Sequence, residues 1–196
     1  MLNKLVELIN SNVPEAKAQH INAEIGTSSI QIEASAILKV AEFIKDNKEL
    51  SFNVLEVISG VDFTEYIEVN YMFANFDVNA PRDLIIKLRV TGRVSPEVLS
   101  ITSVYESANF QERECFDMLG VEFTNHPDPR RILCPDDWEG FPLRKDYMPP
   151  KYYNGMEIYP EHKMNIEDRE FIVRQKEMIK QEKAAAKAKA AEAAVE

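Results

Sequence analysis

The chain has 196 residues, 45% of them hydrophobic and 29% charged, which is enough for one folded domain with a hydrophobic core and some appended segments. Acidic residues outnumber lysine and arginine by 33 to 23, and the net charge of −10 argues against nucleic acid or an anionic lipid surface as the direct partner. No apolar run approaches the roughly 20 residues that a membrane-spanning helix needs, so direct membrane insertion is not expected.

The N-terminal part of the chain predicts two helices separated by a β-hairpin. Residues 2–9 place apolar side chains at helical spacing, and Pro14 ends or interrupts that helix. Residues 21–25 and 29–32 alternate on either side of a Gly-Thr-Ser turn, which is typical of a hairpin. Residues 34–46 carry a clear apolar face at helical spacing, so they predict an amphipathic helix.

Three strands are expected next. Residues 52–58 are mostly apolar, which is typical of a strand buried on both faces, and Gly60 is expected to end it. Residues 67–73 and 84–90 alternate apolar and polar side chains, with a turn at residues 79–81 between them. Because these strands follow one another without crossover helices, they predict mainly antiparallel pairing.

Two more helices are expected after the strands. The first begins after Pro96. The second begins near Asn109, a candidate N-cap that has Glu112 three residues later for reciprocal capping. Gly120 is placed to end this helix in a left-handed conformation, and residues 121–123 then form a brief extended piece.

The fold class that follows is α+β, a two-layer domain with a mainly antiparallel sheet covered by helices, over residues 1–120. The chain continues as an extended, irregular arm over residues 121–165, rich in charge and proline and suited to protein contacts. Residues 166–196 favour helix but have almost no apolar stripe, so they are expected to form a solvated tail.

Residues 111–151 hold the only tryptophan and both cysteines, and they organise the rest of the chain. They indicate a short helix followed by an irregular, proline-punctuated segment with dense charge. Such a segment cannot hold one shape through the hydrogen bonds of a helix or a sheet. Its charges and prolines therefore indicate that it is pinned against something larger.

The runs ERECFDMLGVEF, HPDPRRIL and PDDWEGFPLRKDY closely resemble one family: the C subunit, the small hydrophilic non-redox subunit, of proton-pumping NADH:quinone oxidoreductase, respiratory complex I. The residues that match the family pattern are Glu112, Arg113, Glu114, Asp117, Met118, Gly120, His126, Pro127, Arg130, Arg131, Trp138, Gly140, Pro142, Leu143, Arg144, Lys145, Asp146 and Tyr147. Phe110, Pro129 and Cys134 depart from it, which affects local packing. The resemblance is strong over residues 100–150 and fair over residues 30–100.

The resemblance implies a small peripheral-arm subunit on the cytoplasmic side of the bacterial inner membrane, packed against the D and B subunits. It implies that this chain binds no cofactor and has no catalytic centre, while flavin and iron–sulfur clusters in partner subunits carry electrons from NADH to quinone, coupled to proton translocation. The chain would then scaffold its neighbours. The residues carried over as a partner interface are Glu112, Arg113, Asp117, Arg130, Arg131, Trp138, Arg144, Lys145 and Asp146.

Other interpretations of these residues remain open. The same motif fits the equivalent subunit of a membrane-bound energy-converting hydrogenase, or of a quinone oxidoreductase with another electron donor. A free-standing metal enzyme would use Cys115, His126 and Cys134, but their spacing matches no zinc or iron–sulfur pattern. Two buried thiols and a histidine that hydrogen-bonds a loop are favoured instead. The carboxylates of residues 136–139 are expected to be solvated turn formers rather than a catalytic pair, and Trp138 is either a core aromatic or an interface anchor.

Overall fold

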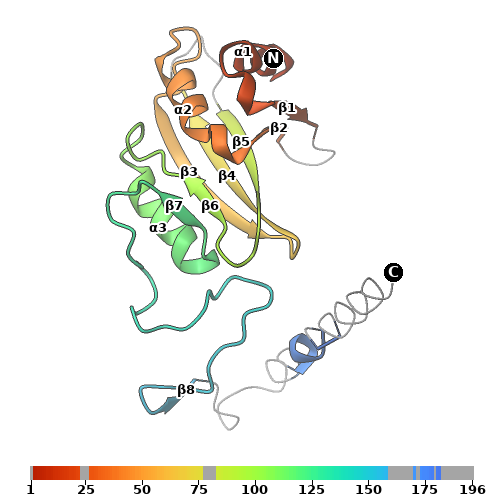
Figure 1. Cartoon of the computed structure of the whole chain (residues 1–196), viewed down its shortest axis with the longest axis vertical. Helices are drawn as coiled ribbons and strands as arrows, with labels where there is room; N and C mark the ends of the chain where they lie inside the picture. Colours follow the sequence, from red (N-terminus) through yellow and green to blue (C-terminus); the bar gives the residue numbers. More distant parts are fainter. Residues whose placement is uncertain are drawn as a thin grey trace. The chain divides into compact units, whose positions relative to one another are not determined.

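The computed structural model describes residues 2–22, 27–76, 83–158, 170, 173–178 and 180–181 (Figure 1). Met1–Tyr147 form one compact unit and Met148–Glu196 form a second. In the second unit, β8 (Tyr152–Tyr153) pairs antiparallel with β9 (Met156–Glu157). The predicted division into a domain, an arm and a tail at residues 120 and 165 stays a prediction. The turn predicted at residues 79–81 and most of the predicted tail lie outside the described residues.

One five-stranded sheet, ordered β1-β2-β5-β4-β3, forms the centre of the first unit. Its strands are β1 (Gln19–Ile21), β2 (Ser29–Ile32), β3 (Val54–Asp62), β4 (Tyr66–Ala74) and β5 (Asp83–Thr91). Neighbouring strands run antiparallel except β2 and β5, which run parallel. The prediction of a mainly antiparallel sheet is therefore confirmed.

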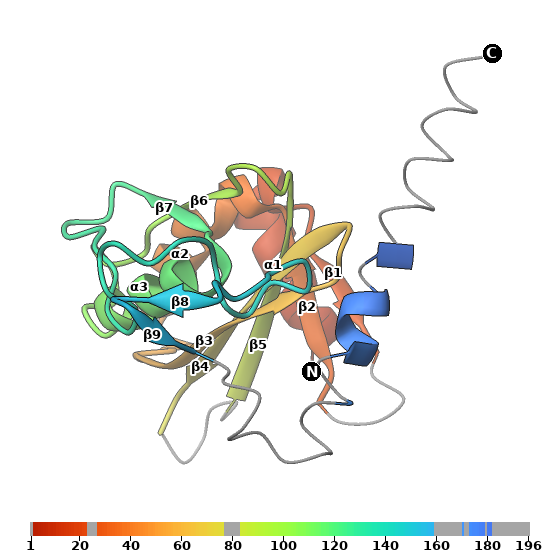
Figure 2. The same cartoon turned by 90° about the horizontal axis from the view of Figure 1, so that it is seen from below.

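Helices cover one face of this sheet (Figures 1 and 2). They are α1 (Leu2–Asn12), α2 (Ile37–Asp46) and α3 (Ala108–Leu119), together with the short 3₁₀ helices η1 (Pro14–Ala16) and η2 (Ala34–Ala36). The residues of α2 at i, i+3, i+4 and i+7 from Ile37 are all buried, as the spacing predicts. Burial of each large apolar side chain contributes about 1.5–3 kcal/mol, so this face fixes α2 on the sheet.

Alternation along β4 and β5 decides which face becomes the core. Val69 on β4 and Leu88 on β5 are register partners and are both fully buried. Their neighbours Glu68 and Lys87 point to the other face and form an ion pair at 3.1 Å. The two-layer α+β fold that the pattern predicts is therefore confirmed, with one apolar and one mixed polar face of the sheet.

Strand β3 is longer and less buried than predicted. It runs through Gly60 to Asp62, and Val57, which lies on the face of the sheet away from the helices, is 47% exposed. Gly60 does not break the strand. A Cβ atom at this position would overlap the side chain of Leu119, so the glycine lets α3 pack directly on β3.

The predicted helix after Pro96 is wrong, because this segment is a strand. β6 (Glu97–Leu99) pairs in parallel with β7 (Glu122–Thr124), and Val98 is buried in the core opposite Phe123. The brief extended piece expected after α3 is confirmed, since it is β7.

The start of α3 also differs from the prediction. The helix begins at Ala108, with Ser107 rather than Asn109 at the N-cap position. Glu112 therefore does not close a capping box, and its side chain is free for the contacts described below. The predicted end is confirmed: Gly120 has a φ of 71° and its N–H donates to the carbonyl oxygen of Phe116 at 2.7 Å.

Candidate interaction segment

Residues 125–147, here called the anchored segment, contain no helix or strand and are held to the domain by side chains. Asp117 of α3 provides one anchor. Its Oδ2 accepts hydrogen bonds from the backbone N–H groups of Ile132, Leu133 and Cys134 at 3.1, 2.7 and 2.8 Å. Its Oδ1 accepts one from Arg131 at 2.7 Å. Burial alone would raise the pKa of Asp117, but these donors outweigh it and hold the pKa below its ordinary value.

Arg113, one helical turn earlier on α3, holds the same turn. Its Nε and Nη2 donate to the backbone oxygens of Arg130 and Arg131, each at 3.0 Å. It also lies 3.6 Å from the carboxylate of Asp128. One face of α3 thus binds both the carbonyl and the N–H groups of a turn whose backbone forms no helix or sheet hydrogen bonds.

Arg144 binds the segment to the C-terminal end of α3. Its guanidinium donates to the backbone oxygens of Leu119, Gly120 and Arg93, and it lies over the ring of Phe141 at 4.6 Å. A cation at this end of a helix satisfies carbonyl groups that have no partner within the helix. A Cβ atom at Gly120 would overlap the Phe141 ring, so only glycine permits this arrangement.

A third anchor lies at the end of β3. The buried carboxylate of Asp62 accepts hydrogen bonds from Arg93 at 2.7 and 2.9 Å, and from the N–H groups of Thr64 and Lys145 at 2.8 Å each. Arg93 also donates to Asp146 at 2.9 Å. Burial opposes ionisation here, but these bonds lower the pKa of Asp62 to about 2.

Trp138 closes the turn that leads into this anchor. Its Nε1–H donates to the hydroxyl of Tyr147 at 3.0 Å, and Gly140 lies against the same tyrosine ring with a φ of 81°. Trp138 is half-buried, so it is not a core aromatic, and its role as an interface anchor stays a prediction. Asp136 and Glu139 on either side are exposed.

Glu112 lies fully buried beneath the segment. Its Oε2 accepts a hydrogen bond from the hydroxyl of Ser100 at 2.7 Å, and its Oε1 accepts one from the N–H of Ile101 at 2.9 Å. Burial raises the pKa of Glu112 to about 7, and these two bonds only partly offset that effect.

His126 connects the start of the anchored segment to α3. Its Nδ1 accepts from the N–H of Asp128 at 3.0 Å, which leaves Nε2 to donate to the backbone oxygen of Asn109 at 3.1 Å. The predicted role of a histidine that hydrogen-bonds a loop is confirmed. Its Nε2 also lies 3.8 Å from the carboxylate of Glu112.

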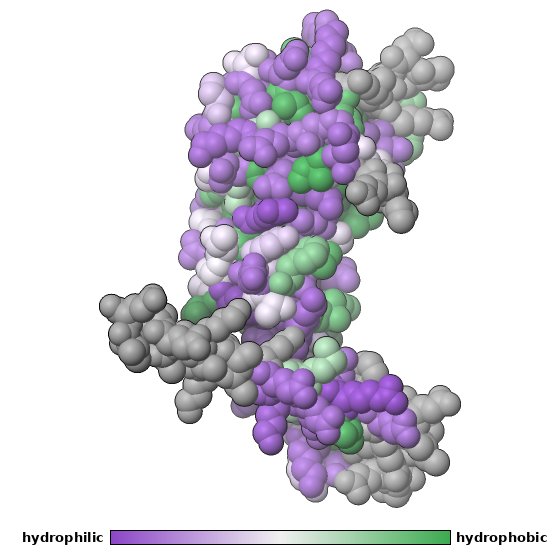
Figure 3. Space-filling model, turned by 90° about the vertical axis from the view of Figure 1, so that its right-hand side faces the viewer, coloured by the Kyte–Doolittle hydropathy of each residue, from purple (hydrophilic) through white to green (hydrophobic). Residues whose placement is uncertain are grey.

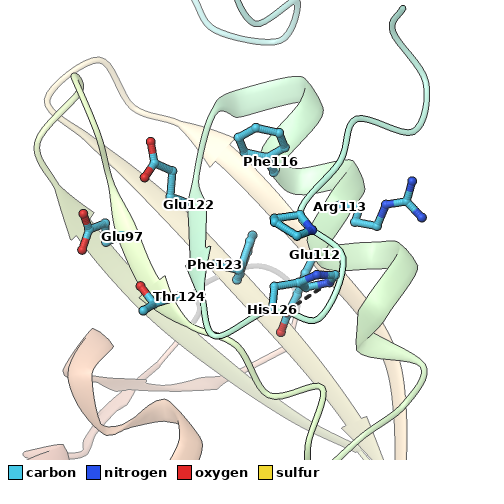
Figure 4. A pocket seen from close by; sticks show the side chains of 9 residues that line it. Glu97, Glu112, Arg113, Phe116, Glu122, Phe123, Thr124 and His126 are labelled. Atoms are coloured by element: carbon cyan, nitrogen blue, oxygen red, sulfur yellow. Dashed lines mark ion pairs between the residues drawn. The ribbon is translucent and has the colours of Figure 1, made fainter. Parts of the chain in front are cut away.

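A pocket of about 510 Å³ opens beside these two residues (Figure 4). It is lined by Glu97, Glu112, Arg113, Phe116, Glu122, Phe123, Thr124, His126 and Pro129.

Cys115, on the buried face of α3, is in the core, and burial raises its pKa to about 12. Cys134 is only half-buried, so the prediction of two buried thiols is correct for Cys115 alone. Within the described ranges, no group of three His, Cys, Asp or Glu residues is arranged to hold a metal ion.

The structure divides the nine predicted interface residues into two groups. The polar groups of Glu112, Arg113, Asp117, Arg131, Trp138 and Arg144 are bound within the first unit. Arg130, Lys145 and Asp146 are exposed to solvent, although Arg130 pairs with Asp128 and Asp146 with Arg93. Their contact with partners stays a prediction, whereas the internal anchoring is observed.

Sequence reasoning missed Asp62 and Arg93, because they lie far along the chain from the residues they bind and no local pattern marks them. It also missed that the anchored segment exposes apolar side chains. Leu133 and Leu143 are each 62% exposed. On the face drawn in Figure 3, hydrophobic residues form small separate patches among hydrophilic ones.

Residues 30–153 match the family described as respiratory-chain NADH dehydrogenase, 30 Kd subunit. The chain belongs to this family. The matched residues include β3, β4, β5, α3 and the whole anchored segment, so the resemblance seen in the motif is confirmed. In the part of the chain that the structure describes, no helix is long and apolar enough to cross a membrane.

Several relatives of the 30-kDa subunit family are similar to this chain. It is 40% identical over 120 residues to the C subunit of NADH-quinone oxidoreductase from Chlorobium phaeobacteroides, across 61% of this chain and 72% of the relative. It is 44% identical over 124 residues to the C subunit from Roseiflexus sp., across 62% and 70%. It is 34% identical over 157 residues to the J subunit of NAD(P)H-quinone oxidoreductase from Prochlorococcus marinus, across 76% and 84%.

A solved structure shares the fold of this 30-kDa subunit family member. It is a chain of the membrane-bound sulfane sulfur reductase, an archaeal respiratory membrane complex, with a TM-score of 0.58. The alignment covers 74% of this chain and 85% of that chain at 21% identity. At this identity the likeness concerns the fold alone.

Proposed function

We propose that this chain is a scaffolding subunit of an NADH:quinone oxidoreductase and binds no redox centre itself. It would lie in the peripheral arm on the cytoplasmic side of the membrane and hold the neighbours equivalent to the D and B subunits at fixed positions. Flavin and iron–sulfur clusters in the partners would carry electrons from NADH to quinone, and proton translocation would be coupled to that transfer.

The observation that supports this proposal is the anchoring of the segment at three points. Asp117 and Arg113 hold one turn, Arg144 holds the next, and Asp62 holds the end. A segment without secondary structure is normally mobile, but here buried, charge-assisted hydrogen bonds fix its backbone. The segment therefore offers a preorganised surface, which reduces the entropy lost when a partner binds.

The alternative is the equivalent subunit of a membrane complex with another electron donor or acceptor, such as an energy-converting hydrogenase. The fold does not choose between these, since it also occurs in the sulfane sulfur reductase complex. The names of the relatives at 34–44% identity favour the NADH-dependent complex.

Purification of the tagged chain from native membranes tests the proposal. After mild detergent extraction, we expect flavin- and iron–sulfur-containing subunits to co-purify, together with NADH-dependent quinone reduction. Recovery with a nickel-containing hydrogenase subunit and no NADH activity would support the alternative. Recovery of a lone soluble chain would contradict both.

A further inference from the structure

The pocket between α3 and the β6–β7 pair lies beside the anchored segment, whose His126 and Pro129 line it, and it has the features of a binding site. Its volume of about 510 Å³ lies within the range of small-ligand pockets. In Figure 4 the carboxylates of Glu97 and Glu122 lie on one side, and the side chains of α3 and His126 lie on the other.

The two rim carboxylates repel each other. Glu97 and Glu122 are register partners on neighbouring parallel strands, so their side chains leave the same face of the pair, on strands about 4.8 Å apart. Both are exposed, and Glu122 accepts a hydrogen bond from the neutral hydroxyl of Ser95 at 2.8 Å. No basic side chain pairs with either of them among the residues that the structure describes. A cation placed between them would remove this repulsion.

A third carboxylate at the pocket also lacks a strong counter-charge. Among the described residues, the fully buried Glu112 is hydrogen-bonded to the neutral donors Ser100 and Ile101, and the Nε2 atom of His126 lies 3.8 Å from its carboxylate. Buried charges in proteins are usually paired. Arg113 does not fill this role, because its guanidinium turns away from the cavity toward the anchored segment (Figure 4).

The remaining walls are apolar. Phe116, Phe123 and Pro129 line the cavity there. Long basic side chains bury their methylene stems on such surfaces while the charged head reaches polar groups. A hydrated metal ion would gain nothing from these walls, and an anion would be repelled by the rim.

We propose that this pocket receives an arginine or lysine side chain from a neighbouring subunit, with its stem against Phe116 and its charged head between Glu97 and Glu122. The inference rests on the proposed function for the identity of the partner, but the preference of the pocket for an organic cation does not depend on it. The chain's net charge of −10 is consistent with a basic partner surface.

Binding of a small probe tests the pocket directly. The full-length chain would be titrated with Nα-acetyl-arginine amide and followed by NMR, with Nα-acetyl-citrulline amide as the uncharged control. We expect the arginine probe to shift the signals of Thr124 and Phe116, and the E97Q/E122Q double variant to bind at least tenfold more weakly. The E42Q/E49Q variant, which changes two exposed acids on and just after α2, should bind like the parent. Equal binding of both probes, or no binding, would overturn the proposal.

A photo-crosslinking residue at Thr124 tests the partner within the assembled complex. We expect a crosslink to a partner segment that contains arginine or lysine, and rescue of an E97K/E122K assembly defect when that basic residue is changed to Glu. A crosslink to a segment without a basic residue, or an intact complex without any crosslink, would overturn the pairing. A chain that enters no membrane complex would instead refute the proposed function, and the probe titration would still decide the pocket.

Discussion

At the scale of single residues, Asp117 of α3 shows that a charged residue of the family motif stabilises the fold of this chain. Its carboxylate binds three consecutive N–H groups and the guanidinium of Arg131. In Asp117→Asn the negative charge is lost, and an NH2 group replaces one carboxylate oxygen. This NH2 group is a hydrogen-bond donor and would face the N–H donors that the oxygen now binds. We expect the free energy of unfolding to fall by about 2–4 kcal/mol, measured by urea unfolding of the full-length chain. Asp136→Asn, at an exposed position, is the control. Equal effects of the two variants would contradict the anchoring role.

Glu112 makes stability depend on pH in the opposite sense to the anchoring acids Asp62 and Asp117. Its pKa of about 7 in the folded chain exceeds its ordinary value of 4.5, so the folded state binds this proton more tightly than the unfolded state. The contribution is therefore complete below pH 4.5 and is lost as the pH rises through 7. Between pH 5 and pH 8, the parent chain should lose up to about 3 kcal/mol of unfolding free energy through Glu112. We expect this loss to be absent in Glu112→Gln. Urea unfolding at both pH values measures this, and an unchanged slope would refute it.

Asp62 behaves in the usual way for a carboxylate. Its pKa falls to about 2 in the folded chain, below its ordinary value of 3.8, because Arg93 and two backbone N–H groups bind the ionised form. Its contribution is therefore present above pH 3.8 and is lost as the pH falls toward 2. Glu112 and Asp62 together place the maximum of their joint contribution between about pH 4 and pH 5.

At the scale of elements, the packing of α3 on β3 depends on Gly60. We expect Gly60→Ala to destabilise the fold by about 1–3 kcal/mol because the new methyl group overlaps Leu119. In a Leu119→Ala background the same change should cost much less, since the space is then available. A double-mutant cycle from urea unfolding measures this coupling. Additive effects would show that Gly60 is needed for its backbone and not for the close approach.

A side chain of α3 also hydrogen-bonds the exposed edge of β3. Gln111 donates from its amide nitrogen to the backbone oxygen of Glu56 at 3.1 Å and accepts from the N–H of Ile58 at 2.6 Å. Its side chain thus imitates a neighbouring strand next to the β-bulge between Leu55 and Val57. Unpaired edges promote aggregation, so this contact protects the edge at the point where the ladder is irregular.

At the scale of the whole molecule, internal anchoring and partner contact can be separated by comparing two neighbouring basic residues. Arg144 is bound to backbone oxygens of the domain, whereas Lys145 is exposed. We expect Arg144→Glu to release the anchored segment and abolish assembly, with faster proteolysis of residues 125–147 in the isolated chain. Lys145→Glu should leave proteolysis unchanged and weaken assembly only if Lys145 contacts a partner. Native gel electrophoresis of membrane extracts measures assembly. Unchanged proteolysis of the Arg144 variant would contradict the anchoring.

Local pattern alone determined the two-layer α+β class, α2, the central strands and the left-handed end of α3, because spacing and capping act between residues close in the chain. The motif alone also identified the family. Only the tertiary structure decided that the segment after Pro96 is a strand, because β6 forms through pairing with β7, and that Gly60 lies within β3. It also decided that Asp117, Arg113 and Arg144 bind this chain's own backbone. Their partners lie 14 to 51 residues away, and no periodicity reports contacts at that separation.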